Sequence, residues 1–171
     1  DYTNAIDKLT GEFLATWSTD NQFQSSSVFK MFALNIFFGT AFGLVDQDTM
    51  NQLHDDFGLW SDGLIGLAPW RIPGSPFSKA YDARLRLLKT IGRLIEQFKV
   101  EVPPDSDRAQ KTMMGRVCYA KDEDGKPLSM DCLKDNILLM AFAGHDTTYM
   151  SLGTAMMYLA KYPAIQEAIV Q

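Results

Sequence analysis

The sequence is poor in the residues that build covalent and metal frameworks. Its 171 residues include two cysteines, Cys118 and Cys132, and two histidines, His54 and His145. Two distant cysteines supply neither a disulfide framework nor the ligand spacing of a zinc site, so we expect free thiols in a reducing compartment. The sequence shows no signal peptide, and no apolar run approaches the roughly 18 residues of a membrane span.

Positive charge is also scarce. Lys and Arg number 16 against 21 Asp and Glu, which gives a net charge of −5. A general nucleic-acid-binding surface is basic, so we expect no nucleic-acid partner. A content of 46% hydrophobic and 22% charged residues is typical of a folded globular protein. The chain starts without Met and stops within a helical pattern, so we expect residues 1–171 to form a single incomplete domain.

What the sequence has in abundance is helical periodicity. Apolar residues recur every three or four positions, which predicts helices at 2–19, 28–42, 46–59, 78–99, 107–120 and 133–161. Ser26 or Ser27 is expected to cap the second helix and Ser129 the last. An Asp-Gly pair at 124–125 predicts a small hairpin. With little strand pattern elsewhere, the fold class is mainly α, a helical bundle around a long central buried helix.

Glycines and prolines interrupt this pattern between 57 and 77. The stretch predicts a loop, yet it carries Trp60, Trp70 and other apolar residues that loops normally lack. It either folds onto its own core or forms an apolar lid or membrane-touching surface. The helix that follows carries Arg86, Lys89 and Arg93, which we expect on a solvated face, with contact to a partner or a lipid headgroup as the alternative. Asp82 is expected to pair with Arg86 one turn later.

The longest helical stretch, 136–161, has an unusual middle. It is apolar on nearly every side except for Gly144-His145-Asp146-Thr147-Thr148. Thr147 lies one turn after Ala143 and can donate to its carbonyl. Gly144 costs a helix about 1 kcal/mol relative to Ala, which makes sense if a bulky flat group approaches there. A hydroxyl beside the Asp146 carboxylate suits a proton relay, although a small-residue notch at a helix crossing explains the spacing equally well.

The string Ala143-Gly144-His145-Asp146-Thr147-Thr148 fits the pattern (Ala or Gly)-Gly-x-(Asp or Glu)-Thr-(Thr or Ser). This pattern and its flanks, 122–129 and 158–163, resemble the long central helix of the cytochrome P450 haem-thiolate monooxygenases. Residues 70–77, with Arg84 and Arg86, resemble the F–G loop and G helix of branches acting on sterols, retinoids and terpenoids. Residues 37–39 resemble the end of the E helix. The resemblance implies an internal fragment of a partial cytochrome P450 fold, from about the D helix to the J helix.

The resemblance also implies roles for individual residues. Thr147 would steady bound oxygen and Asp146 would relay protons. The other implied roles are contact with haem for Ala143, Gly144 and Thr147, and contact with substrate for Leu139, Phe142 and Ala143. His145 occupies the variable position and is expected to point outward or to lie one layer behind the pocket.

The implied cofactor is haem b, but no metal ligand is expected in this chain. The family's ligand is a cysteine in a Phe-x-x-Gly-x-Arg-x-Cys-x-Gly run, which is absent here, as is its Glu-x-x-Arg pair. The fragment alone should therefore be inactive. The implied partners are O2, an apolar small molecule and an NADPH-dependent reductase or ferredoxin, with peripheral membrane contact through 57–77. The implied location is the cytosolic face of the endoplasmic reticulum in a eukaryote or the cytoplasm in a bacterium.

Two other functions remain open on the residues. An all-helical HD-type metal-dependent phosphohydrolase would use the pairs His54-Asp55 and His145-Asp146, since His and Asp are apt ligands for its metal. That alternative gives Thr147 and Thr148 no role. A non-enzymatic helical scaffold is the other alternative, and it predicts no preference for haem in a longer chain.

Overall fold

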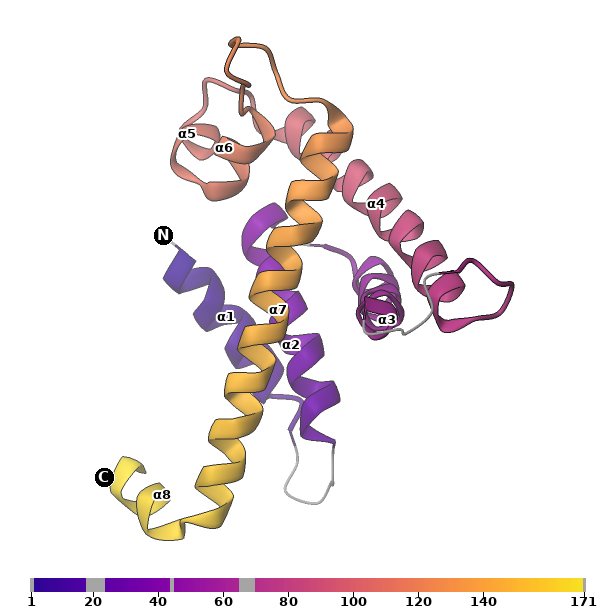
Figure 1. Cartoon of the computed structure of the whole chain (residues 1–171). Helices are drawn as coiled ribbons and strands as arrows, with labels where there is room; N and C mark the ends of the chain where they lie inside the picture. The colour runs from indigo at the N-terminus through magenta and orange to yellow at the C-terminus, as the bar shows by residue number, and fades with distance from the viewer. Residues whose placement is uncertain (1, 18–23, 44, 65–69, 171) are drawn as a thin grey trace.

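The computed structural model describes residues 2–17, 24–43, 45–64 and 70–170. Over these ranges the chain is helical, as predicted, with one isolated β-bridge between Lys121 and Pro127 at the expected Asp-Gly turn. Figure 1 shows the helices, which are α1 (Tyr2–Leu14), α2 (Ser25–Phe42), α3 (Gln47–Leu64), α4 (Pro76–Glu101), α5 (Asp107–Lys111), α6 (Met113–Cys118), α7 (Met130–Lys161) and α8 (Pro163–Val170).

Hydroxyl caps define where several helices begin. The Oγ of Ser129 accepts a hydrogen bond from the Cys132 amide at 3.2 Å and starts α7, as predicted. Ser75 caps α4 in the same way through the Ser78 amide at 3.1 Å. The expected cap of α2 by Ser26 or Ser27 is wrong, because the helix already begins at Ser25, after Gln24.

The helix predicted at 107–120 is divided in two. Thr112 is extended (φ −94°, ψ 152°), and its Oγ1 accepts a hydrogen bond from the Gly115 amide at 3.1 Å. This side chain therefore ends α5 and caps α6. Threonine competes for backbone hydrogen bonds in this way at helix starts, and the apolar periodicity does not reveal the break.

The long helix α7 runs the length of the molecule, with α2 packed alongside it and α4 near its N-terminal half (Figure 1). The helices α3 and α4 form an antiparallel pair. Three contacts show the direction, since Thr49, Asp56 and Gly63 of α3 meet Arg93, Arg86 and Ala80 of α4 in reverse order. The core lies where these helices meet, and its fully buried members include Leu34, Phe38, Phe57, Leu87, Ile91, Ile95, Met114 and Ile137.

The basic residues of α4, Arg86, Lys89 and Arg93, are exposed, as predicted, but two of them also bind residues of α3. Arg86 binds the buried carboxylate of Asp56, with Nε 2.8 Å from Oδ1, and Arg93 donates to the Thr49 hydroxyl at 2.8 Å. Asp82 pairs with Arg71 and not with Arg86. The partners lie on α3 or before α4, so helical spacing within α4 could not identify them.

The burial of α7 is one-sided. The buried residues are Leu133, Ile137, Leu138, Ala141 and His145, whereas Leu139 is 63% exposed and Met150 60% exposed. The expected burial on most sides is therefore found on one side only, because α2 and α4 cover that side. In the described ranges, no helix has the length and apolar content that crossing a membrane requires.

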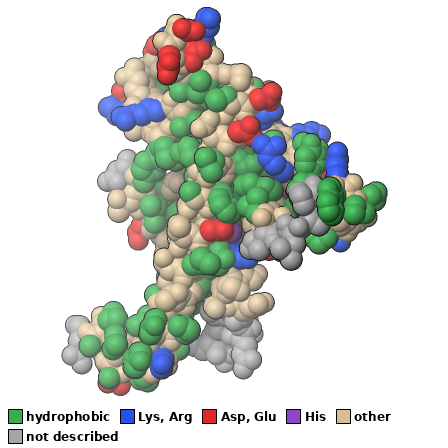
Figure 2. All heavy atoms as spheres, viewed as in Figure 1, with side chains coloured by type: hydrophobic (Ala, Val, Ile, Leu, Met, Phe, Trp, Pro, Cys, Tyr) green, Lys and Arg blue, Asp and Glu red, His purple; other side chains and the backbone are tan. Residues whose placement is uncertain are grey.

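The predicted loop at 57–77 is partly helical. The helix α3 continues to Leu64, Phe57 is fully buried, and the Trp60 ring packs against Phe57 at 5.3 Å between ring centroids. Residues 65–69 lie outside the described residues. Beyond them Trp70 is 69% and Ile72 57% exposed, and hydrophobic side chains gather where α3 leads into α4 (Figure 2).

Candidate functional site

The open side of α7 carries the threonine that the sequence singles out. The Oγ1 of Thr147 donates to the Ala143 carbonyl at 2.8 Å, as predicted, and both residues are exposed. The bond uses the hydroxyl hydrogen and leaves the oxygen lone pairs free to accept. The hydroxyl is therefore held in place, facing away from the side of α7 that the described helices cover.

Gly144 continues this surface. A Cβ added to it would meet only the Cδ2 of Phe37, at 3.8 Å, which is an ordinary contact. Packing within the described chain therefore does not require a glycine here. With exposed Ala143 beside it, Gly144 forms a shallow shelf on which a flat group can rest close to the backbone.

Asp146 lies at the edge of the shelf. Its side chain is 34% exposed, and its Oδ1 is 2.7 Å from the Nδ1 of His145. His145 is 2% exposed and lies on the far side of α7 from Thr147. Two helical steps turn the chain by about 200°, which accounts for this placement. His145 therefore lies behind the shelf, and the alternative expectation that it points outward is wrong.

The imidazole of His145 sits in an aromatic pocket. Its ring centroid is 5.1 Å from that of Phe57 and 5.3 Å from that of Tyr149. Burial lowers the pKa of His145 from its ordinary value of 6.5 and outweighs the opposing effect of Asp146. The buried Nε2 has no hydrogen-bond partner among the described residues. The ring is therefore favoured in its neutral form.

The two residues expected to contact substrate differ in position. Leu139 stands on the open side of α7 at 63% exposure. Phe142 is half-buried and packs edge-on against Trp60 at 5.4 Å between centroids. One face of α7 is therefore exposed and carries Leu139, Ala143 and Thr147. Gly144 lies next to this face, and Phe142 and Asp146 lie at its margin.

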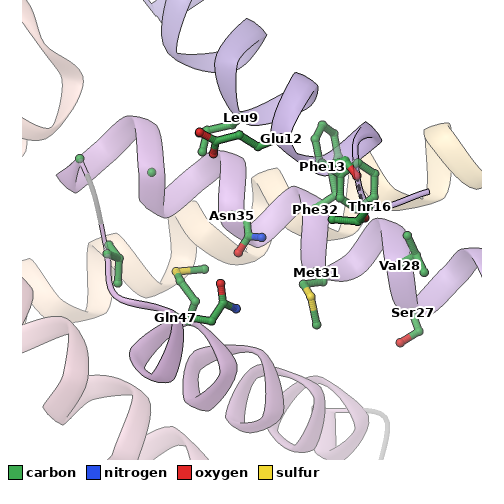
Figure 3. A pocket seen from close by; sticks show the side chains of 14 residues that line it. Leu9, Glu12, Phe13, Thr16, Ser27, Val28, Met31, Phe32, Asn35 and Gln47 are labelled. Atoms are coloured by element: carbon green, nitrogen blue, oxygen red, sulfur yellow. Dashed lines mark hydrogen bonds between the residues drawn. The ribbon is translucent and has the colours of Figure 1, made fainter. Parts of the chain in front are cut away.

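A half-open hollow of about 490 Å³ lies elsewhere, between α1, α2 and the start of α3. Figure 3 shows its lining, where the tilted rings of Phe13 and Phe32 lie 4.5 Å apart between centroids and the amides of Asn35 and Gln47 also line the hollow. None of the site residues predicted from the sequence lines this hollow.

The described residues offer no ready metal centre. No three His, Cys, Asp or Glu side chains converge there in a way that could hold an ion. Burial raises the pKa of the Cys118 thiol to about 11, which disfavours a metal-binding thiolate. Each histidine has its Nδ1 beside the neighbouring aspartate, at 3.4 Å for His54 and 2.7 Å for His145. The HD-type alternative thus lacks, in the described ranges, the ligand cluster that it needs.

Comparison with known proteins decides between these alternatives. The model of the family described as "Cytochrome P450" matches residues 1–171. The chain belongs to the cytochrome P450 family. A cytochrome P450 from Synechocystis sp. is 32% identical over 120 residues, covering 70% of this chain and 26% of that protein. A beta-amyrin 28-monooxygenase from Medicago truncatula is 24% identical over 171 residues, covering 99% of this chain and 36% of that protein.

The fold agrees with this assignment. A cyanobacterial cytochrome P450 solved with retinoic acid bound superposes with a TM-score of 0.85 at 26% identity, covering 99% of this chain and 38% of that one. The chain thus spans about a third of the length of these cytochromes P450. The partial, mainly α cytochrome P450 fold expected from the sequence is confirmed.

One feature of the site was not predicted from the sequence. The contact between His145 and Asp146 joins adjacent residues, which on a helix usually face different directions. A histidine directly before the acidic residue of the motif is the signal that could have drawn attention to it.

Proposed function

We propose that this chain forms the oxygen-side half of the haem pocket of a monooxygenase that hydroxylates an apolar, terpenoid-like molecule. The observation that carries the proposal is the exposed shelf of Ala143, Gly144 and Thr147 on α7, in a chain of the cytochrome P450 family. The shelf has small side chains and a fixed hydroxyl, and packing against the described residues does not require a glycine at position 144. These properties fit a flat macrocycle.

Haem b, held by a cysteine outside this chain, would supply the iron at which O2 is activated. The chain's own residues would shape the space above it. Ala143 and Gly144 leave room for the ring, and Thr147 presents a hydroxyl oxygen held by its bond to the Ala143 carbonyl. Because this bond fixes its orientation, the Thr147 hydroxyl needs little reorganisation to accept a hydrogen bond from a polar ligand.

Asp146 would move protons toward this hydroxyl. Its carboxylate is partly exposed, so it can exchange protons with water, and it adjoins Thr147 in sequence. A carboxylate beside a hydroxyl can pass a proton inward while the rest of the pocket stays apolar. The electrons would come from an NADPH-dependent reductase or a ferredoxin.

The substrate class is inferred from the pocket margin and the relatives. Leu139 offers an exposed apolar contact and Phe142 an aromatic edge. The relatives include a beta-amyrin 28-monooxygenase and a taxoid 7-beta-hydroxylase from Taxus cuspidata, the latter 28% identical over 130 residues, 76% of this chain and 26% of that protein. We therefore propose a bulky isoprenoid skeleton as substrate.

The test uses the full-length protein that contains this chain. The reduced protein should give the carbon monoxide absorption band of a thiolate-bound haem. With its reductase and NADPH, it should add one oxygen atom to a triterpene, a taxane or a retinoid, detected by mass spectrometry. Absence of the thiolate band would contradict the proposed haem cofactor. A protein that shows the band but oxidises none of the three compounds would contradict the proposed substrate class.

We also propose that the exposed apolar end of α3 and α4 touches a membrane surface. Leu64, Trp70 and Ile72 are each more than half exposed, and Arg71 lies between Trp70 and Ile72 in sequence. A tryptophan with a nearby cation suits the interface of a bilayer. This placement would let an apolar substrate enter from lipid.

Replacing Trp70 and Ile72 by Ser should reduce sedimentation of the full-length protein with anionic phospholipid vesicles. We expect a loss of at least about thirtyfold, since burying such side chains in an interface contributes roughly 1–2 kcal/mol each. The control is Val100→Ser, because Val100 is 84% exposed at the other end of α4. Equal vesicle binding by both variants and the unaltered protein would refute the contact.

A further inference from the structure

His145 is buried against the rear of the proposed proton pathway, and no role has been given to it. We infer that His145 is a positioning residue, which holds the Asp146 carboxylate in the orientation needed for proton transfer. The inference rests on the proposed function of Asp146 and adds a residue from the variable position of the motif. It is carried by the contact between Nδ1 of His145 and Oδ1 of Asp146, 2.7 Å long.

The direction of this hydrogen bond follows from the chemistry of the two groups. An ionised carboxylate only accepts hydrogen bonds, so Nδ1 must carry the proton. In the neutral ring Nε2 then has a bare lone pair, and no described residue donates to it. Burying an unsatisfied polar atom is unfavourable, and a leucine at this position would avoid it. The contact with Asp146 is the one hydrogen bond of this ring that the structure describes.

The imidazole can serve as a fixed support because its own position is locked. It is 2% exposed and packs against both the Phe57 ring of α3 and the Tyr149 ring of α7. A packed side chain has few other rotamers available. One carboxylate oxygen of Asp146 is thereby tied to the core, and the other remains to exchange protons at the margin of the shelf.

Burial lowers the pKa of His145 and keeps the ring a neutral donor, while the nearby charges act in both directions. Lys30 of α2 and His54 of α3 act electrostatically on His145, and both disfavour a positive ring. Asp146 of α7 favours it, but burial outweighs Asp146. The Nδ1–H group therefore stays available without introducing a charge that would compete for the protons carried by Asp146.

The decisive variants are His145→Asn and His145→Leu in the full-length protein. The Asn amide nitrogen stands near the place of Nδ1 and can still donate to Asp146, whereas Leu fills the pocket and cannot donate. We expect His145→Leu to lower product formed per NADPH at least threefold, within the roughly 100-fold that a misplaced catalytic group can cost. His145→Asn should recover most of this coupling. Val100→Leu, at a residue that is 84% exposed at the far end of α4, is the control and should leave coupling unchanged.

A second measurement needs no turnover. In protein labelled with 15N at histidine, the His145 signals should show a protonated Nδ1 and an unprotonated Nε2, with His145→Asn used to assign them. A protonated Nε2 with a bare Nδ1 would overturn the inference even if His145→Leu fails to fold. Equal coupling in His145→Leu and the unaltered protein would overturn it as well.

Failure of the proposed function gives a different result. In that case the unaltered protein lacks the thiolate band or forms no product, so coupling cannot be defined for any variant. The positioning role then falls together with the function on which it rests. A normal band and normal turnover with an insensitive His145→Leu variant would refute the positioning role alone.

Discussion

Thr147 is the residue on which the proposed chemistry depends most directly. Its hydroxyl is exposed, held by the Ala143 carbonyl, and free to accept hydrogen bonds. In the full-length protein, Thr147→Ala should leave the thiolate band intact, because the hydroxyl contributes nothing to holding the haem iron. Product per NADPH should fall at least about tenfold and hydrogen peroxide should rise in its place, since a general acid–base group typically contributes 100-fold or more.

The control for this experiment is the neighbouring Thr148→Ala, which removes an exposed threonine one position away on the same helix. It should keep product formation near that of the unaltered protein. Full coupling in Thr147→Ala would show that the assigned role is wrong. A loss of the thiolate band would place the residue in haem binding instead of proton transfer.

For single residues of the site, the sequence predicted the contacts that follow from spacing along one helix and not those that depend on packing between helices. The bond from Thr147 to Ala143 follows from the rise of a helix and was predicted. The burial of His145 could not be read in the same way, because apolar residues on most sides of α7 hide which side faces the core. Only the packing of α2 and α4 against α7, with Phe57 of α3 against His145, distinguishes the two sides.

At the scale of elements, the contact between α3 and α4 depends on a glycine. A Cβ at Gly63 would overlap the Cβ of Ala80, so the two helices can be this close only without a side chain there. Gly63→Ala should destabilise the protein by about 1–3 kcal/mol, as overpacking generally does. The measurement is the free energy of unfolding from denaturant titration of the full-length protein.

Gly58→Ala is the matched control on the same helix, because nothing lies within 4 Å of a Cβ at that position. Removing a glycine from a helix interior should leave stability equal or raise it by about 0.5–1 kcal/mol. Equal free energies of unfolding for the two variants would show that the close approach at Gly63 does not determine how α3 packs against α4.

Helix existence was predicted well and helix ends less well, for identifiable reasons. Ser129 starts α7 because its hydroxyl caps the Cys132 amide, which the sequence signals directly. The glycines at 58 and 63 suggested that α3 ends early, yet packing against α4 carries it to Leu64. Likewise the buried partner of Arg86 is Asp56, 30 residues away, and only the tertiary structure brings them together.

At the scale of the whole molecule, the buried His145 couples stability to pH. Its pKa in the folded chain is lowered by burial from the ordinary 6.5, so between those two values the unfolded chain binds more protons. The contribution of neutral His145 is therefore complete above pH 6.5 and is lost as the pH falls from there through the folded-state pKa. Unfolding free energies of the full-length protein should decline over this window.

His145→Asn cannot take up that proton, so its free energy of unfolding should decline less over the same window. The comparison needs matched denaturant titrations of both proteins from about pH 7.5 to pH 5, a range that includes the ordinary histidine pKa. Parallel curves would mean that the pKa of His145 is not lowered by folding. The comparison does not depend on catalysis, so it tests the burial of the ring independently of the proposed function.

The one-sided covering of α7 has a consequence for how this chain fluctuates. Its buried residues lie between Leu133 and His145, and the stretch from Met150 to Lys161 contains none. Backbone amides exchange with solvent deuterium in proportion to how often their local structure opens. In the chain alone, amides before His145 should therefore exchange slowly and those after Met150 progressively faster. A cytochrome P450 in which further polypeptide covers the same helix should show a much flatter gradient.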